Sequence, residues 1–212
     1  MNKTKQEEDF TREVPTISTI LQLFRLFLPR NTKTIARLDK FMDLNIEKIN
    51  KLKEINLKGL IIDSDDCISY NHGEILEENV THIKRLHDQG IKLVIYSNMR
   101  KTERYEAIES YAKVLTRIPP KPGIKGFEKA LQTLNLPAKN VAMVGDNYLT
   151  DAGAIRLGIS FIKIKPIDIP SENRVFNLAV TLYGYLRGFY DKISRIHDKL
   201  RRKKPLKSKD LK

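Results

Sequence analysis

Between residues 57 and 164 the sequence alternates short aliphatic runs with longer amphipathic segments. Continuous aliphatic runs are typical of strands buried on both faces, and their alternation with helices predicts parallel pairing through right-handed crossovers. The expected strands are 57–63, 91–97, 114–118, 141–146 and 160–164, and the expected helices are 76–89, 102–113, 123–135 and 149–157. The sequence therefore predicts an α/β fold, a doubly wound, Rossmann-like parallel sheet of about five strands.

The segments that flank this core have a different pattern. Residues 1–15 are polar and predict a mobile arm, whereas apolar residues at helical spacing over 17–27 and 34–53 predict an N-terminal helical segment, 16–56. A long apolar stripe after residue 171 predicts one amphipathic helix. We thus expect four parts, which are the arm 1–15, the helical segment 16–56, an α/β domain 57–170 and a basic C-terminal helix and tail 171–212.

Composition limits the location of the chain and its possible partners. A single cysteine among 212 residues favours a reducing compartment, and the absence of a signal peptide or an apolar run of about 18 residues favours a cytoplasmic protein. Of the net charge of +13, most lies in residues 172–212, with 12 Lys and Arg against 4 Asp and Glu. This tail could contact solvent, nucleic acid or the inner face of an anionic membrane, and its Leu, Phe and Tyr content favours the membrane. The same apolar stripe could instead pack on the sheet or pair with a second chain, so the oligomeric state stays open.

Polar side chains follow the expected strands at the points where the strands end. Since the carboxyl ends of parallel strands face one crevice, we expect these side chains to lie together. Converging carboxylates repel one another unless a cation joins them, and oxygen ligands suit Mg²⁺. A hydroxyl and an ammonium suit the phosphate that Mg²⁺ brings, and an aspartate can then act as a nucleophile. The residues concerned are Asp63, Asp65, Ser97, Asn98, Lys121, Asp146 and Asp151.

In order and spacing, "DSDDC", "SN", "KP" and "GDNYLTD" resemble the four motifs of the haloacid dehalogenase superfamily of aspartate-nucleophile phosphatases. The resemblance covers residues 57 to about 166, and its implications are expectations. It implies that Asp63 becomes an aspartyl-phosphate, that Asp65 is the general acid and base, and that Ser97, Asn98 and Lys121 bind phosphate. It also implies that Mg²⁺ is held by Asp63, Asp146 and the backbone carbonyl of Asp65, with Asp151 supporting that shell.

Spacing between the motifs leaves no room for an inserted cap domain, because 34 positions separate Asp63 from Ser97 and 24 separate Ser97 from Lys121. A capless site is open and suits a large or surface-bound substrate. Among capless members, "FLPRNTKTIARLD", "PPKPGIKGFEKAL" and "FIKIKPI" resemble the YqeG-type branch. That branch includes phosphatidylglycerophosphate phosphatases, so the implied reaction removes the terminal phosphate of this lipid and leaves phosphatidylglycerol.

Two residues depart from the family pattern. Asp66 stands where Asn is common, and Cys67 stands where Thr or Ser is usual. Cys67 is interpreted as a buried thiol, because no histidine partner is evident for a nucleophile. Two alternatives to the lipid phosphatase therefore stay open. One is a soluble phosphatase acting on a nucleotide, sugar phosphate or phosphoprotein; the other is a catalytically weak scaffold that binds RNA, a ribosomal partner or a membrane.

Overall fold

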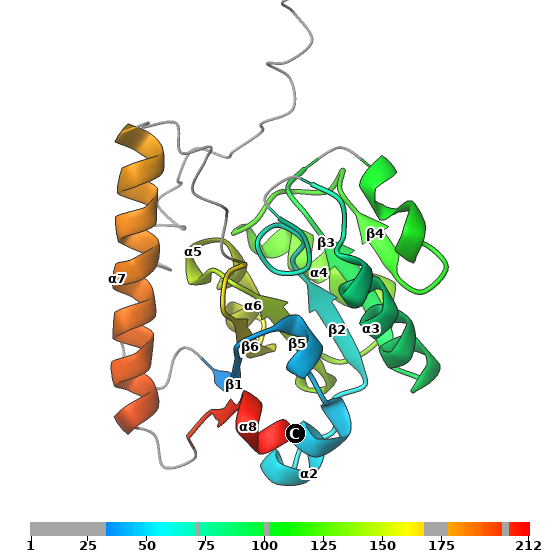
Figure 1. Cartoon of the computed structure of the whole chain (residues 1–212), viewed down its shortest axis with the longest axis horizontal. Coiled ribbons are helices and arrows are strands. Elements are labelled where there is room, and N and C mark those ends of the chain that lie inside the picture. The colour runs from blue at the N-terminus through cyan, green and yellow to red at the C-terminus, as the bar shows by residue number, and fades with distance from the viewer. Residues whose placement is uncertain (1–32, 71–72, 100–101, 168–177, 201–203) are drawn as a thin grey trace, which may run out of the picture.

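A parallel sheet of seven strands forms the centre of the computed structural model, which describes residues 33–70, 73–99, 102–167, 178–200 and 204–212 (Figure 1). The order in the sheet is β4-β3-β2-β5-β6-β1-β7, and every pair is parallel. The strands are β1 (Thr34–Leu38), β2 (Gly59–Ile62), β3 (Lys92–Tyr96), β4 (Lys113–Leu115), β5 (Val141–Gly145), β6 (Ser160–Ile164) and β7 (Leu206–Lys207). The predicted α/β class with a doubly wound parallel sheet is confirmed.

Helices cover both faces of the sheet. The α-helices are α2 (Ile46–Lys53), α3 (Glu77–Asp88), α4 (Ile124–Leu134), α5 (Tyr148–Asp151), α6 (Gly153–Arg156), α7 (Leu178–Leu200) and α8 (Ser208–Leu211), and the 3-10 helices are η1 (Phe41–Asp43), η2 (Glu103–Ile108) and η3 (Ala138–Asn140). One buried cluster joins α2, α3, η2 and α8 to one face, and a second joins α4, α5 and α6 to the other. Among these described helices, none is long and apolar enough to cross a membrane.

Side chains alternate between the two buried clusters along the central strands. In β2, Leu60 and Ile62 belong to the first cluster while Ile61 belongs to the second, and all three are inaccessible to solvent. The same alternation in β3 and β5 explains why these strands are continuous aliphatic runs in the sequence. Chain order reverses between β2 and β5, so the carboxyl ends of these two strands flank the crevice where such folds bind ligands.

Several predicted elements differ from the structure. The helical pattern predicted from 34 is wrong over Thr34–Leu38, because these residues form β1 and pair with β6 along the sheet. Its buried side chains alternate as in a strand, which hydrophobic spacing over five residues does not distinguish from a helix turn. The helix expected at 102–113 is reduced to η2, and the one expected at 149–157 is split into α5 and α6. The arm 1–15 and the first helical pattern lie outside the described residues.

The C-terminal segment is part of the domain. Its described helix is α7 (Leu178–Leu200), and β7 pairs with β1 at the edge of the sheet. α8 follows, and its Leu211 is buried in the first cluster. The predicted C-terminal helix corresponds to α7, and the predicted tail contains β7 and α8, which extend the sheet and the core.

Arg37 of β1 holds α7 against the sheet. Its Nε donates to Asp198 Oδ2 at 2.6 Å and its Nη1 to Asp191 Oδ1 at 2.9 Å. Its Nη2 donates to Ser194 Oγ at 2.6 Å and to the Tyr148 hydroxyl at 3.2 Å. The Arg37 side chain is only 16% exposed, so four polar groups and a mostly desolvated cation depend on one another.

Replacing Arg37 with Leu should lower the free energy of unfolding by about 3 kcal/mol, because two partly buried carboxylates lose their cation. Urea denaturation followed by circular dichroism measures the change. Arg85→Leu, on the exposed side of α3, is the matched control and should change stability by less than about 0.5 kcal/mol. Equal stability of Arg37→Leu and wild type would contradict this role for Arg37.

Candidate active site

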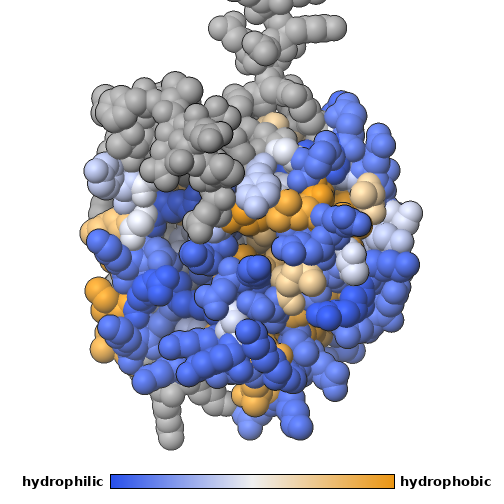
Figure 2. All heavy atoms as spheres, in the orientation of Figure 1, coloured by the Kyte–Doolittle hydropathy of each residue, from blue (hydrophilic) through white to orange (hydrophobic). Residues whose placement is uncertain are grey.

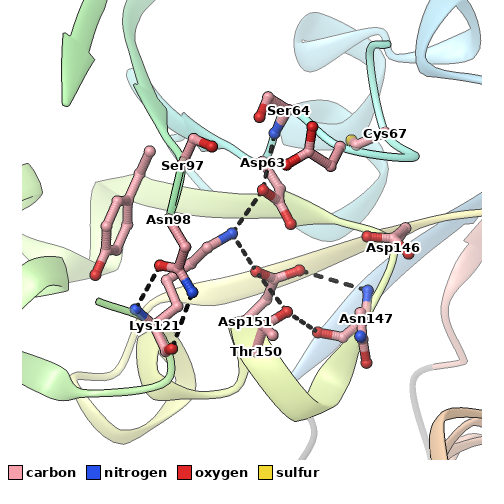
Figure 3. Close-up of polar contacts among 12 residues, drawn as sticks. Asp63, Ser64, Cys67, Ser97, Asn98, Lys121, Asp146, Asn147, Thr150 and Asp151 are labelled. Carbon is pink, nitrogen blue, oxygen red and sulfur yellow. Dashed lines mark hydrogen bonds and ion pairs between the residues drawn. The ribbon is translucent and has the colours of Figure 1, made fainter. Parts of the chain in front are cut away.

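The loop that follows β2 places Asp63 at the tip of the strand. Ser64 N–H donates to Asp63 Oδ1 at 2.8 Å, and the Ser64 carbonyl accepts from Ile68 N at 3.0 Å and from Ser69 N at 3.1 Å. Asp66 has a φ of 56° in this turn, a conformation that Asp and Asn tolerate better than most residues. The loop therefore turns sharply, and the first carboxylate of "DSDDC" stays at the edge of the sheet (Figure 3).

Lys121 joins two of the predicted carboxylates. Its Nζ lies 2.6 Å from Asp63 Oδ1 and 2.9 Å from Asp151 Oδ1, and its side chain is 2% exposed (Figure 3). Burial alone would lower the pKa of the Lys121 ammonium, but the charges of Asp151 and Asp63 raise it above its ordinary value. Lys121 is thus a fixed cation, with one hydrogen bond that orients the expected nucleophile.

Asp146 and Asp151 come from the turn after β5. A Cβ at Gly145 would lie 2.1 Å from Asp151 Oδ2, so only glycine leaves room for this carboxylate against the strand. Asp151 Oδ1 accepts from Lys121, and Asp151 Oδ2 accepts from Asn147 N–H at 3.4 Å. Since protein donors engage both of its oxygens, Asp151 fits a supporting position.

Asp63, Asp146 and Asp151 form a buried group whose ligand atoms lie within 4.8 Å of one another. Burial raises the pKa of all three carboxyl groups, that of Asp146 to about 6 and that of Asp151 to about 8. The positive charges of Lys121 and Arg187 lower these pKa values in part. Repulsion between the carboxylates adds to the increase. A divalent cation would relieve both costs, and an all-carboxylate donor set suits a hard cation such as Mg²⁺. The residues present therefore fit a metal site.

Asp65 lies apart from this group. Its Oδ1 is 2.7 Å from Nη1 of Arg104, a residue of η2 whose Nη2 also donates to Ser69 Oγ. The Asp65 side chain is 26% exposed and the Arg104 side chain 4%, so a buried guanidinium holds a partly exposed carboxylate. Sequence reasoning missed Arg104, because η2 has no motif and only the folded sheet brings it beside the β2 loop.

Ser97 and Asn98 follow β3. Ser97 is buried and its Oγ accepts from Met99 N–H at 3.1 Å. Asn98 donates to the Lys121 carbonyl at 3.1 Å and accepts from Lys121 N–H at 2.8 Å (Figure 3). Both polar groups of the Asn98 amide are thus engaged with the backbone that carries Lys121. The contact of Asn98 with phosphate stays a prediction, and the structure shows its side chain bound to the Lys121 backbone.

Two further cations reach Asp146, and neither was predicted. Arg187 of α7 pairs through Nη2 with the Asp146 carboxylate, and its Nη1 lies 3.3 Å from Asp66 Oδ2. Lys163 of β6 is buried and donates to the Asp146 carbonyl. Arg187 is 41 positions from Asp146, so no local spacing in the sequence could have indicated this contact.

Cys67 is buried beneath the loop, with Sγ 4.0 Å from the Val144 carbonyl. Burial raises the pKa of its thiol well above the ordinary value, and the nearby carboxylates Asp63 and Asp146 raise it further. Because the reactive form of cysteine is the thiolate, this environment is that of an inert thiol. The interpretation of Cys67 as a packing residue agrees with its surroundings.

Comparison with known proteins gives a family and a relative. A model of the haloacid dehalogenase-like hydrolases matches residues 5–158. The probable phosphatase YqeG of Bacillus subtilis (strain 168) is 28% identical over 119 residues, which are 55% of this chain and 69% of that protein. The family match includes all four motifs around the crevice.

Among solved structures, the cobalt-bound deoxy-D-mannose-octulosonate 8-phosphate phosphatase of Haemophilus influenzae is 18% identical, with a TM-score of 0.43, over 69% of this chain and 91% of that one. An uncharacterized protein of Corynebacterium glutamicum is 21% identical, with a TM-score of 0.40, over 63% and 96%. Both scores lie below 0.5, so neither likeness bears on the substrate.

Adding Mg²⁺ should raise the melting temperature of the wild type by about 5 °C at saturation, because a ligand that binds only the folded state stabilises it. Asp146→Asn should abolish this increase, since the amide removes one charge from the donor set. Asp88→Asn, at the exposed end of α3, should leave the increase unchanged. Differential scanning fluorimetry with and without Mg²⁺ measures the effect, and an equal increase in Asp146→Asn would exclude Asp146 as a ligand.

Proposed function

The chain belongs to the haloacid dehalogenase-like hydrolases, as its four motifs predicted, and we propose that it is an Mg²⁺-dependent phosphatase that works through an aspartyl-phosphate on Asp63. The observation that carries the proposal is the placement of Asp63, which Lys121 orients beside Asp146 at the switch point of the sheet. The relative of known class, a probable phosphatase, supports the same reaction.

In the proposed reaction an Asp63 oxygen attacks the phosphorus of a phosphomonoester, and the bond to the leaving oxygen breaks. Asp65 protonates that oxygen and then removes a proton from the water that splits the aspartyl-phosphate. Lys121 and Ser97 hold the transferring phosphoryl group. Mg²⁺ held by Asp63, Asp146 and the Asp65 carbonyl would offset the repulsion between the nucleophile and the phosphate.

Arg104 has a positioning role in this scheme. Its hydrogen bond to Asp65 Oδ1, at 2.7 Å, holds this carboxylate at the loop that follows β2. The guanidinium is itself held by Ser69 and is 4% exposed at its side chain, so it does not reach the reacting atoms. A buried arginine at this distance keeps Asp65 in one orientation through both proton transfers.

Asp63→Asn should reduce hydrolysis of a generic phosphomonoester, para-nitrophenyl phosphate, by at least about 10³-fold, because an amide cannot form the covalent intermediate. Release of para-nitrophenolate in the presence of Mg²⁺ measures the rate. Asp88→Asn is the matched control and should retain wild-type activity. Equal rates in wild type and Asp63→Asn, or no activity in the wild type across a panel of phosphate esters, would favour the weak scaffold instead.

For the substrate we propose phosphatidylglycerophosphate, with phosphatidylglycerol as the product. The site is open in the described residues, since α3 is the sole helix between β2 and β3, and η2 and β4 are the elements between β3 and α4. No inserted domain stands over Asp63 in these described segments. An open site suits a phosphate that projects from a surface.

The exposed face of α7 supports contact with such a surface. Polar residues of α7, among them Asp191, Ser194 and Asp198, face Arg37, which leaves the apolar residues on the outer side. Those exposed side chains include Tyr185, Leu186, Phe189, Ile196 and Leu200. Figure 2 shows hydrophobic atoms at the left edge of the molecule, over α7. A helix with apolar residues outward and Lys192, Arg195 and Lys199 along one flank is suited to the surface of an anionic bilayer.

Ile196→Ser should weaken binding to vesicles rich in phosphatidylglycerol about tenfold, because one apolar side chain is withdrawn from the bilayer interface. Leu52→Ser on α2 is the matched control, since Leu52 is 52% exposed and Ile196 is 56% exposed. Co-sedimentation with the vesicles measures binding, and turnover of phosphatidylglycerophosphate in them measures activity. Efficient cleavage of a soluble ester with no turnover of the lipid would favour the soluble phosphatase.

A further inference from the structure

Asp66, which departs from the family pattern, contacts α7 in the folded chain. Its Oδ2 lies 3.3 Å from Nη1 of Arg187, and Nη2 of the same guanidinium pairs with Oδ2 of Asp146. The side chains of Arg187 and Asp66 are 24% and 22% exposed, whereas that of Asp146 is 4% exposed. One cation from α7 thus joins a partly exposed carboxylate of the loop after β2 to a buried carboxylate of the proposed metal site.

Arg187 is the cation that contacts the Asp146 carboxylate among the described residues. Lys121 pairs with Asp63 and Asp151, and the Nζ of Lys163 donates to the backbone carbonyl of Asp146. Among the charges that act against burial and lower the pKa of Asp146, that of Arg187 is the largest. Arg187 therefore provides part of the charge compensation that a divalent cation would otherwise provide at this carboxylate.

The packing of α7 keeps Arg187 at this position. α7 lies beside α5, the helix that follows Asp146 (Figure 1). Arg187 precedes Asp191 by four residues, so both lie on the face of α7 that Arg37 holds against the sheet. Because the helix is fixed in this way, the guanidinium can leave Asp146 by rotation of the Arg187 side chain alone.

The backbone of Asp66 is held independently of its side chain. Its N–H donates to the Ser69 carbonyl at 3.0 Å, and its carbonyl accepts from Ile167 N–H at 2.9 Å. Its φ of 56° suits Asp and Asn alike. Compared with the Asn that is common in the family, Asp66 thus adds a charge and no change of conformation, and this charge lies beside Arg187.

Mg²⁺ and a guanidinium that share one carboxylate repel each other, because both are cations in contact with the same group. The contact of Arg187 with Asp146 therefore weakens Mg²⁺ binding, and by linkage Mg²⁺ weakens that contact to the same extent. Asp66 is a second carboxylate within reach of the guanidinium, and it lies outside the group formed by Asp63, Asp146 and Asp151. An Arg187 side chain that Mg²⁺ displaces from Asp146 thus remains paired with Asp66.

We propose that Arg187 competes with Mg²⁺ for Asp146 and that Asp66 takes over the guanidinium when the metal binds. These two residues then set the Mg²⁺ concentration at which the site fills. The inference rests on the metal site of the proposed phosphatase and adds the control of its occupancy. At low Mg²⁺ the Arg187 side chain compensates the buried charge of Asp146, and at high Mg²⁺ it leaves this carboxylate to the metal.

Isothermal titration calorimetry of the full chain with magnesium chloride tests the competition without catalysis. Arg187→Gln should bind Mg²⁺ about tenfold more tightly than wild type, because the competing cation is removed. Loss of a merely structural contact would weaken metal binding instead. Arg85→Gln, the same substitution on the exposed side of α3, should bind Mg²⁺ as wild type does. Equal or weaker Mg²⁺ binding by Arg187→Gln overturns the competition.

Asp66→Asn tests the second carboxylate and does not depend on the folding of Arg187→Gln. It should bind Mg²⁺ about fivefold more weakly than wild type, because a displaced Arg187 loses the charge that receives it. When Arg187→Gln is already present, Asp66→Asn should change the Mg²⁺ affinity by less than about twofold, since no guanidinium is left to transfer. Unchanged or tighter binding by Asp66→Asn alone, or an equal loss in both backgrounds, overturns the role of Asp66.

Hydrolysis of para-nitrophenyl phosphate separates this inference from the proposed function. The Mg²⁺ concentration that gives half-maximal activity should fall about tenfold in Arg187→Gln, in line with the binding constant. Hydrolysis with the same half-maximal Mg²⁺ concentration in wild type and Arg187→Gln overturns the competition and leaves the phosphatase. The expected shifts in Mg²⁺ affinity without hydrolysis of any phosphate ester by wild type overturn the phosphatase and leave the competition.

Discussion

Three buried carboxylates lie together, and the ammonium of Lys121 lies between two of them. This interaction fixes much of the surrounding structure. Asp63 can end β2 in the interior because Lys121 is 2.6 Å away, and Lys121 can be buried because Asp151 accepts its second hydrogen bond. Gly145 is required because a Cβ there would meet Asp151, and Asn98 holds the backbone from which Lys121 extends. Lys121 and Arg187 offset the repulsion between the carboxylates only in part, and a divalent cation would relieve the rest.

The orientation of α7 follows from a second set of charges. Arg37 is mostly buried at the edge of the sheet and needs acceptors, which the polar side of α7 supplies. Since that side faces inward, the exposed apolar side chains of α7, among them Tyr185, Phe189 and Ile196, face outward, whereas Tyr190 is buried in the second cluster. The same orientation brings Arg187 to Asp146. One polar interface thus accounts for the exposed apolar stripe and for the contact between α7 and the active site.

Local patterns in the sequence predict the site residues that directly follow a strand. Asp63, Asp65, Lys121 and Asp146 follow strands, and parallel strands bring their ends together whatever the details of packing, so the crevice could be predicted. Arg104, Lys163 and Arg187 enter from elements distant in the chain, and their positions depend on how η2, β6 and α7 pack. The sequence predicts a helix at β1 because Ile35, Leu38 and Met42 have helical spacing. The pairing of β1 with β6 is a tertiary interaction that this spacing does not show. The sequence also predicts the apolar stripe on α7, but whether the stripe faces the sheet or the solvent depends on the contacts of Arg37 with this helix.

The C-terminal segment cannot be treated as an appendage whose removal tests one property. β7 pairs with β1, and β1 carries the arginine that orients α7, so deleting 172–212 would expose the edge of the sheet and leave Arg37 without its carboxylates. It would also remove Leu211 from the core and Arg187 from Asp146. A truncated chain that fails on a lipid substrate would therefore report lost stability as readily as lost membrane contact. Replacing single exposed side chains on the outer face of α7 separates the two, because such changes leave β7, Leu211 and the contacts of Arg37 in place.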